Sequence, residues 1–301
     1  AKLIMRSIEI EETSLNIDNP QRVLPFLELA LIYQTVGLYD EAIKTLRGVL
    51  DFQKNILGES HIQLASTLYV LGVNYEFKNL YDQAEKTYLH ALDIQEQSLN
   101  TNHHEITSTL VGLGRNYQRQ NKYEKADKFY RRAIKSLLQV SQREIPYLPN
   151  SNRLKFTNSI KDKYPKRIYK SVSQSKIMAK LGLFLRLNRH GLLEEIEKRQ
   201  ADLSQFSSSA QQNLKDQISA NTIQLASIHL SRKERQDLIR TIEILEKKLY
   251  RAMPQLKPRL ITVEQIADII PRNSVLIEYQ KYQSFEKSYY VALALLPNGK
   301  I

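Results

Sequence analysis

A pattern that recurs every 42 residues constrains the fold of this chain more than any other feature. The pattern is clearest between residues 71 and 84, and the same frame reappears upstream and downstream without a gap. Matching positions are Leu29, Tyr33, Gly37, Tyr39 and Ala42, then Leu71, Tyr75, Asn79, Tyr81 and Ala84, then Leu113, Tyr117, Asn121, Tyr123 and Ala126. Self-similarity of this length is the sequence signature of stacked structural repeats.

Apolar and small residues within each unit follow helical spacing, as in Leu68, Leu71 and Tyr75. Each unit is therefore predicted to be two amphipathic helices joined by a tight turn, at Gly37, Asn79 or Asn121. The three pairs are expected at about 20–57, 62–99 and 104–141. Six positions are predicted to pack the repeats together: Tyr33, Tyr75, Tyr117, Ala42, Ala84 and Ala126. A surface that stacks nucleobases on these tyrosines is the less favoured alternative.

The spacing of these residues resembles the tetratricopeptide repeat, and the long joint at residues 56–61 is similar to the longer repeats of kinesin light chain. The resemblance covers residues 1–142, as half a repeat followed by three full ones. It implies a right-handed α-solenoid whose concave groove, lined mainly by the first helix of each pair, binds a protein or peptide ligand.

Eight residues are the candidates for contacts in this groove: Tyr69, Val73, Glu76, Phe77, Val111, Arg115, Gln118 and Arg119. Family members that grip the acidic tails of chaperones place Lys and Asn in the groove. This chain has residues such as Leu27, Leu31 and Val73 instead. The sequence therefore argues against a receptor for chaperone tails.

Positive charge is concentrated after the repeats. The net charge of the chain is +12, and residues 143–180 contain ten Lys or Arg against two acidic residues. Prolines in this stretch predict a basic linker over residues 143–165. The candidate basic patch consists of Lys161, Lys163, Lys166, Arg167 and Lys170. A solvated loop is the favoured interpretation, ahead of a docking site for an acidic protein and a phosphate-binding patch, since no base-reading module is recognisable.

Residues 166–270 are predicted to be a helical connector that contains a long antiparallel hairpin. Ser231 with Glu234, and Thr262 with Gln265, have the spacing of helix capping boxes. Residues 271–301 change pattern, because β-branched and aromatic runs at 275–279 and 289–296 predict two strands.

Residues 207–301 resemble the start of a CHAT domain, the caspase-like domain that often follows tetratricopeptide repeats in bacteria, notably cyanobacteria. The resemblance implies that residues 271–301 are the opening β-hairpin of an incomplete α/β domain. Active CHAT members use a His and a Cys beyond these strands. The chain has no Cys, so we expect no enzyme activity from it, and the activity of a longer parent protein stays open.

His61 and His103 occupy equivalent positions between repeats, and a structural role is predicted for both. A metal pair of His103 with His104 is disfavoured, on the argument that adjacent residues on a helix do not face each other. No metal, cofactor or phosphate loop is expected. No apolar run reaches the roughly 18 residues that span a bilayer, and no signal peptide is recognisable, so a cytoplasmic protein is predicted.

The sequence thus favours a mainly α protein that recognises a protein partner and acts as the regulatory arm of a bacterial CHAT-domain protein. A first alternative is a non-catalytic fragment of a caspase-like cysteine peptidase. A second is a nucleic-acid-binding module that uses residues 143–180. Self-association through the unpaired strand edge near residues 289–296 is a further hypothesis.

Overall fold

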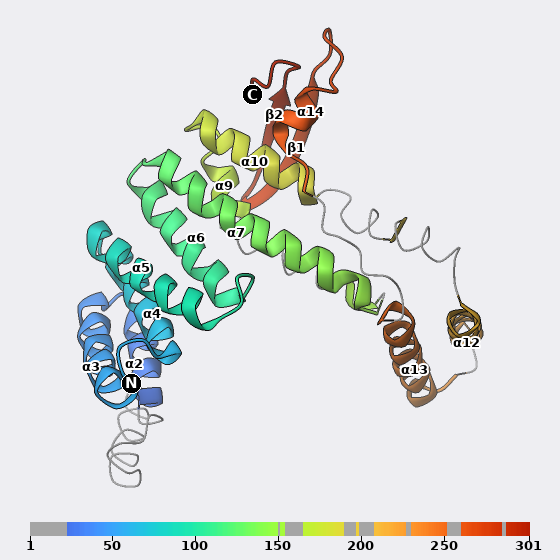
Figure 1. The fold of residues 1–301 in the computed structure, drawn as a ribbon, viewed down its shortest axis with the longest axis horizontal. Coiled ribbons are helices and arrows are strands. Elements are labelled where there is room, and N and C mark those ends of the chain that lie inside the picture. Colours follow the sequence, from blue (N-terminus) through green and yellow to red (C-terminus); the bar gives the residue numbers. More distant parts are fainter. Residues whose placement is uncertain are drawn as a thin grey trace. The chain divides into compact units, whose positions relative to one another are not determined.

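The computed structural model describes residues 23–149, 151–153, 165–189, 197–198, 208–226, 230–251, 260–284 and 287–301 (Figure 1). The half repeat predicted over residues 1–16 lies outside these ranges. The chain divides into two compact units, Ala1–Ser136 and Leu137–Ile301.

The first unit is a succession of helices, and those between residues 24 and 119 each pack against the next along the chain. They are α2 (Leu24–Thr35), α3 (Tyr39–Leu57), α4 (Ile62–Phe77), α5 (Tyr81–Ser98), α6 (His104–Arg119) and the beginning of α7 (Tyr123–Glu144). The three predicted helix pairs are confirmed. Helices α4 and α6, the first helices of successive pairs, also contact each other.

Each helix pair is joined by the same turn. Gly37, Asn79 and Asn121 have φ values of 80°, 61° and 57°, in the left-handed region where Gly and Asn are tolerated best. The N–H of Leu80 then reaches back to the carbonyl of Tyr75 at 2.9 Å, and the equivalent bonds recur in the other two turns. This is the Schellman arrangement that closes a helix. The turns predicted at these three residues are confirmed.

The residues assigned to packing between repeats lie mostly in the core. Ala42, Ala84 and Ala126 are fully buried, and Tyr75 and Tyr117 are nearly so, whereas Tyr33 is half-buried. The hydroxyl of Tyr117 donates to Glu85 Oε1 at 2.6 Å, and the hydroxyl of Tyr75 accepts from Arg47 at 2.8 Å. The tyrosines therefore fill space and hold polar partners on neighbouring repeats.

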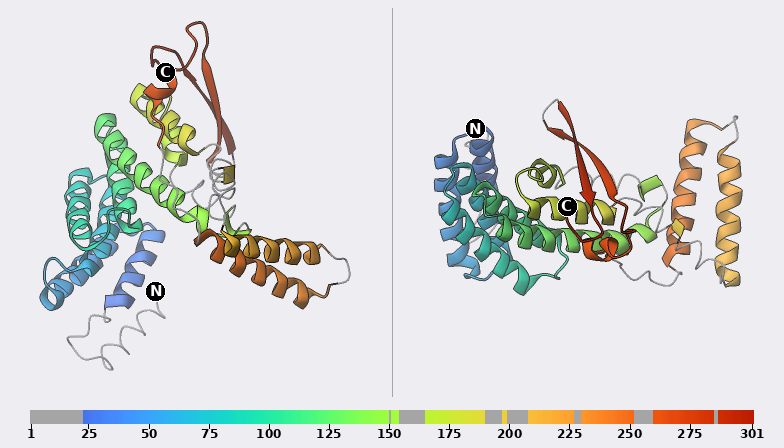
Figure 2. Two further views of the ribbon diagram at one scale, coloured as in Figure 1. Left: turned by 45° about the vertical axis from the view of Figure 1, so that its right-hand side comes forward. Right: turned by 90° about the horizontal axis from the view of Figure 1, so that it is seen from above.

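The second unit contains the end of α7 and several further helices. These are the 3₁₀ helix η2 (Ile145–Tyr147), α9 (Pro165–Lys170), α10 (Lys176–Arg189), α12 (Ser209–Leu225), α13 (Arg232–Arg251) and α14 (Val263–Ala267). Helices α12 and α13 run side by side as the predicted hairpin (Figure 2). The capping boxes predicted at Ser231 and Thr262 are confirmed by reciprocal hydrogen bonds with Glu234 and Gln265.

Two antiparallel strands end the chain, β1 (Leu276–Ser284) and β2 (Lys287–Leu295), in the register that pairs Leu276 with Leu295. Leu293 and Leu295 are buried on the face that turns to the helices, and Arg186 Nε of α10 donates to Glu278 Oε2 at 3.0 Å. In the part of the chain that the structure describes, no helix has the length and apolar character needed to cross a membrane.

Candidate functional site

The predicted groove residues come from two helices that touch. Tyr69, Val73, Glu76 and Phe77 lie on α4, at intervals of three or four residues that place them along one side of the helix. The other four lie on α6 with the same spacing. Contact between α4 and α6 brings the two sets together, which makes this the candidate site.

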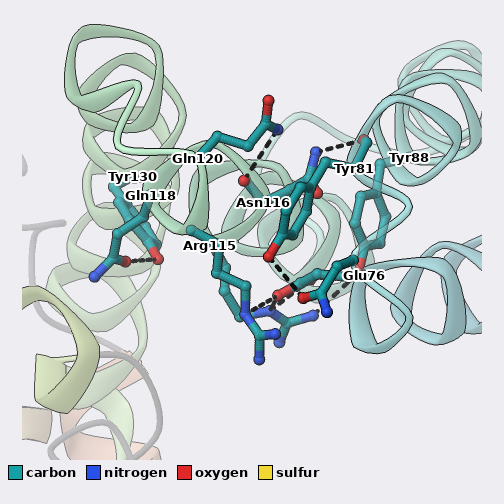
Figure 3. Close-up of polar contacts among 10 residues, drawn as sticks. Glu76, Tyr81, Tyr88, Arg115, Asn116, Gln118, Gln120 and Tyr130 are labelled. Atoms are coloured by element: carbon teal, nitrogen blue, oxygen red, sulfur yellow. Dashed lines mark hydrogen bonds and ion pairs between the residues drawn. The ribbon is translucent and has the colours of Figure 1, made fainter.

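Glu76 lies at the centre of the set, and its side chain is only 2% exposed. Arg115 Nε donates to both carboxylate oxygens, at 2.6 and 2.7 Å (Figure 3). The hydroxyl of Tyr88, from α5, donates to Oε2 at 3.1 Å, and Arg119 Nε lies 3.0 Å from Oε1. A buried carboxylate is tolerated when it is paired and hydrogen-bonded in this way, so these contacts offset the cost of burying Glu76.

The pKa values of the partners follow from this packing. Burial raises the pKa of Tyr88 well above its usual value, and the negative charge of Glu76 raises it further. Burial by itself lowers the pKa of Arg115, but the hydrogen bond and charge of Glu76 outweigh it, and the net shift is upward. Tyr88 therefore remains a neutral donor, and Arg115 remains a cation, throughout the physiological range.

An exposed cation and an exposed aromatic ring lie beside this buried network. The side chain of Arg119 is 38% exposed, and its guanidinium carbon lies 5.6 Å from the centre of the Phe77 ring. Phe77 is 41% exposed and stacks in parallel on Tyr39 of α3, with 5.2 Å between ring centres. Two arginines share one carboxylate, so the group carries an excess positive charge. It can attract a carboxylate and cover an apolar side chain.

The other groove candidates contribute less open surface. Val73 and Val111 are buried, and Tyr69 is half-buried with its ring 5.9 Å from that of Tyr88. Gln118 accepts a hydrogen bond from Tyr130 at 2.6 Å. The assignment of these residues to a binding surface stays a prediction, and Phe77 and Arg119 are the two candidates exposed enough to meet a partner directly.

Tyr39 and Tyr88 belong to the site but were not among the candidates. The 42-residue frame does carry a signal for the ion pair that Tyr88 joins, because Glu76 is equivalent to Gln118 and Arg115 is equivalent to Val73. A carboxylate at one position of one repeat, and a guanidinium at another position of the next, replace neutral residues of the frame. Together they indicate an ion pair between α4 and α6. Tyr39 carries no such signal.

Of the predicted basic patch, Lys161 and Lys163 lie outside the described residues. The other three, Lys166, Arg167 and Lys170, lie on α9, where Arg167 and Lys170 are exposed. Other cations of the basic stretch have structural partners. Arg153 is buried, donates to two backbone carbonyls at 3.0 and 3.1 Å and lies over the ring of Tyr250. Lys180 pairs with Glu264. These contacts reduce the charge that is open to a phosphate backbone.

The joint histidines cap helices. Nδ1 of His61 accepts from the backbone N–H of Gln63 at 3.3 Å, and Nδ1 of His103 accepts from that of Glu105 at 3.4 Å, which fits the predicted structural role. The argument against contact between His103 and His104 was wrong, since their rings stack with centres 4.5 Å apart. His103 precedes the helix and has extended backbone angles, so helical geometry does not separate the two side chains.

Helix pairs joined by identical turns and stacked in sequence define the first unit as a helical repeat array. The family profile of the tetratricopeptide repeat matches residues 23–97 and 78–139, so this part of the chain consists of tetratricopeptide repeats. Such repeats generally mediate protein–protein interaction.

Two crystal structures of nearly identical TPR-like repeats, from a protein of Podosopora anserina designated a kinesin light chain, are similar to the chain at 19% identity. One covers 78% of this chain and 99% of its own, with a TM-score of 0.42. The other, a variant of the same repeats with one residue replaced, covers 77% and 98%, with a TM-score of 0.41. No curated protein matches the chain.

Proposed function

We propose that the repeats bind a protein or peptide partner through the exposed group formed by Tyr39, Phe77 and Arg119. The observation that carries this proposal is the position of Arg119, which lies 3.0 Å from the buried carboxylate of Glu76 and over the Phe77 ring, yet keeps 38% of its side chain exposed. Its guanidinium is thus oriented before a partner arrives, which lowers the entropy lost on binding. The favoured ligand is a peptide segment with a carboxylate next to an apolar side chain.

Selection of 12-residue random peptides on the full chain would test the proposal, with dissociation constants of the selected peptides measured by fluorescence polarisation. Phe77→Ala and Arg119→Ala are each expected to weaken binding about tenfold, the effect of removing roughly 1.4 kcal/mol of contact energy. Leu89→Ala and Lys128→Ala are matched controls, because both residues are exposed on second helices of the pairs and lie outside the group.

Binding through this group should weaken as salt is raised, because Arg119 lies at the exposed rim. If no peptide is enriched, or if the selected peptides bind the Phe77 and Arg119 variants as tightly as the unaltered chain, the proposed surface is wrong.

The proposal extends to a regulatory arm of a bacterial CHAT-domain protein. In it, residues 1–142 are the repeats, 143–165 the basic linker, 166–270 the helical connector and 271–301 the opening β-hairpin of the CHAT-like domain. What supports it is the order of elements, repeats, then helical hairpin, then strands. The outer face of β1 and β2 also exposes Ile277, Tyr279 and Tyr290, by 45%, 65% and 71%. Such a face suits further layers of a larger domain or a second copy of the chain.

Regulation requires that occupation of the groove alters the helical connector. Hydrogen exchange of α12 and α13, compared with and without a selected peptide, measures this coupling directly. We expect slower exchange in these helices when the peptide is bound. Exchange that changes only in α2–α6 would leave peptide binding intact and remove the regulatory part of the proposal.

A further inference from the structure

Three metal-binding side chains meet where α6 begins. His103, His104 and Glu105 each place one ligand atom, a ring nitrogen or a carboxylate oxygen, within 4.8 Å of the other two. His103 is the extended residue before the helix, with φ −67° and ψ 143°, and His104 and Glu105 are the first two helical residues. The change from extended to helical backbone is what lets three consecutive side chains gather on one side.

Glu105 adds a second observation, an enclosed carboxylate oxygen within this cluster. Its Oε2 atom is enclosed and has no hydrogen-bond partner among the residues that the structure describes. Nor does any described cation form an ion pair with this carboxylate. Buried polar atoms are almost always satisfied, and one that is not calls for a water or an ion.

We propose that His103, His104 and Glu105 bind a Zn²⁺ ion. Two imidazoles and one carboxylate are ligands that Zn²⁺ prefers, and three protein ligands leave a fourth position for water or for a side chain of another molecule. Zn²⁺ ligands at about 2.0–2.1 Å in a tetrahedron lie roughly 3.4 Å from one another. Ligand atoms up to 4.8 Å apart therefore need to approach one another by up to about 1.4 Å, through rotation about the χ angles of the three side chains.

Metal binding competes with the helix cap. Nδ1 of His103 accepts from the Glu105 N–H at 3.4 Å, which is longer than an ordinary hydrogen bond. If Nδ1 binds the metal, its single lone pair leaves the N–H. If Nε2 binds the metal, Nδ1 carries the proton and no longer accepts. Zn²⁺ should in either case change the environment of the Glu105 backbone amide.

The positive end of the helix dipole opposes a cation at this position, and the carboxylate of Glu105 in the first turn offsets that effect. The proposal therefore depends strongly on Glu105, because the two neutral imidazoles supply no negative charge. Glu105→Gln keeps the size of the side chain and removes that charge.

The preceding repeat supplies a matched internal control. His61 caps α4 with the same bond, from Gln63 N–H to Nδ1 at 3.3 Å, but Ile62 and Gln63 stand where His104 and Glu105 stand in α6. A metal held by one capping histidine alone would bind equally at both joints. A metal held by the trio binds only at the second.

Zn²⁺ titration of the full chain against a chromophoric chelator tests the site, with ¹⁵N spectra reporting on the Glu105 amide. One equivalent of Zn²⁺ should bind, and the Glu105 amide should shift while the Gln63 amide does not. His103→Asn, which retains a good N-cap residue, and Glu105→Gln should each weaken binding at least tenfold. His61→Asn should leave it unchanged.

The thermal midpoint adds a readout that separates lost ligands from lost folding. Without metal, the His103→Asn and unaltered chains should melt at similar temperatures, and Zn²⁺ should raise the midpoint of the unaltered chain only. The proposal is overturned if no stoichiometric binding occurs, if His61→Asn weakens binding as much as His103→Asn, or if Glu105→Gln binds as tightly as the unaltered chain.

Discussion

Tyr88 and Tyr130 are equivalent tyrosines in successive repeats, and they share their packing but not their polar partners. Each is almost completely buried, at 0% and 1% exposure, against a glycine of the preceding helix. A Cβ at Gly72 would lie 2.7 Å from the Tyr88 ring, and one at Gly114 would lie 2.8 Å from the Tyr130 ring. The close approach of paired helices is thus the constant part of the repeat.

The hydroxyl partners differ in charge. Tyr88 donates to the Glu76 carboxylate, whereas Tyr130 donates to the neutral amide oxygen of Gln118 (Figure 3). Glu76 is accommodated because α6 supplies Arg115 and Arg119. The contact between glycine and tyrosine is therefore what the two repeats share. The hydrogen-bond partner of the tyrosine can be a carboxylate in one repeat when arginines of the next repeat pair with it. In the repeat that has the carboxylate, Glu76 also holds the exposed Arg119 of the proposed binding surface in position.

The largest expected effect comes from replacing Arg115, which tests whether this residue is what stabilises the buried Glu76 carboxylate. Arg115→Met should lower the free energy of unfolding around α4–α6 by about 3 kcal/mol, because it leaves Glu76 buried with a weaker partner. Hydrogen exchange of α4 amides in the full chain measures this locally.

Arg119→Met is the matched control. Its side chain is 38% exposed, against 14% for Arg115, so its loss should cost less than about 1 kcal/mol. Equal losses for the two variants would contradict the central role given to Arg115. A negligible loss for both would show that neither arginine is needed to stabilise the buried side chain of Glu76.

The second prediction concerns the close contact between glycine and tyrosine that the two repeats share. Gly72→Ala should destabilise the first unit by about 2 kcal/mol, since neither helix nor the buried Tyr88 ring has room to yield. Gly114→Ala should cost less, because Tyr130 is bonded to the half-buried Gln118 and can shift with it. Thermal and urea unfolding, followed by circular dichroism, measure which of the two variants loses more stability.

Gly48→Ala in α3 controls for the helix propensity of the added methyl group. Among the residues that the structure describes, no atom outside the adjoining backbone of α3 lies within 4 Å of a Cβ at Gly48, so this change should stabilise the chain by roughly 0.5–1 kcal/mol. If Gly72→Ala stabilised the chain as well, the close contact with Tyr88 would have no energetic weight.

The fold of the repeats was predictable because its determinants are local and recur. The left-handed turn at Asn79 depends on a residue type that tolerates positive φ, and the helices depend on apolar spacing, so both are written in the sequence within one unit. The capping boxes and strands of the second unit were predictable for the same reason.

The site was predicted less completely because its geometry depends on residues far apart in the chain. Glu76 was expected on an open groove surface, but Arg115, a full repeat away, encloses it. Arg153 was counted within a basic segment, yet it is buried against Tyr250. His103 and His104 were treated as helical neighbours, and one extended residue brought them together. Tertiary partners decided each case, and no local pattern encodes them.

The smallest expected effect is the difference between two hydroxyl contacts. The Tyr88 hydroxyl donates to a carboxylate, and the Tyr130 hydroxyl donates to an amide oxygen. Tyr88→Phe should cost about 1.5 kcal/mol, since a hydrogen bond to a carboxylate is stronger than one to an amide and water cannot replace it at a buried site. Tyr130→Phe should cost about 0.5 kcal/mol, because Gln118 is half-buried and can bond to water instead. Repeating Tyr88→Phe in the Glu76→Gln background should reduce its cost to that of Tyr130→Phe. If the cost in that background stayed at its original value, the difference between the two repeats would lie in packing and not in charge.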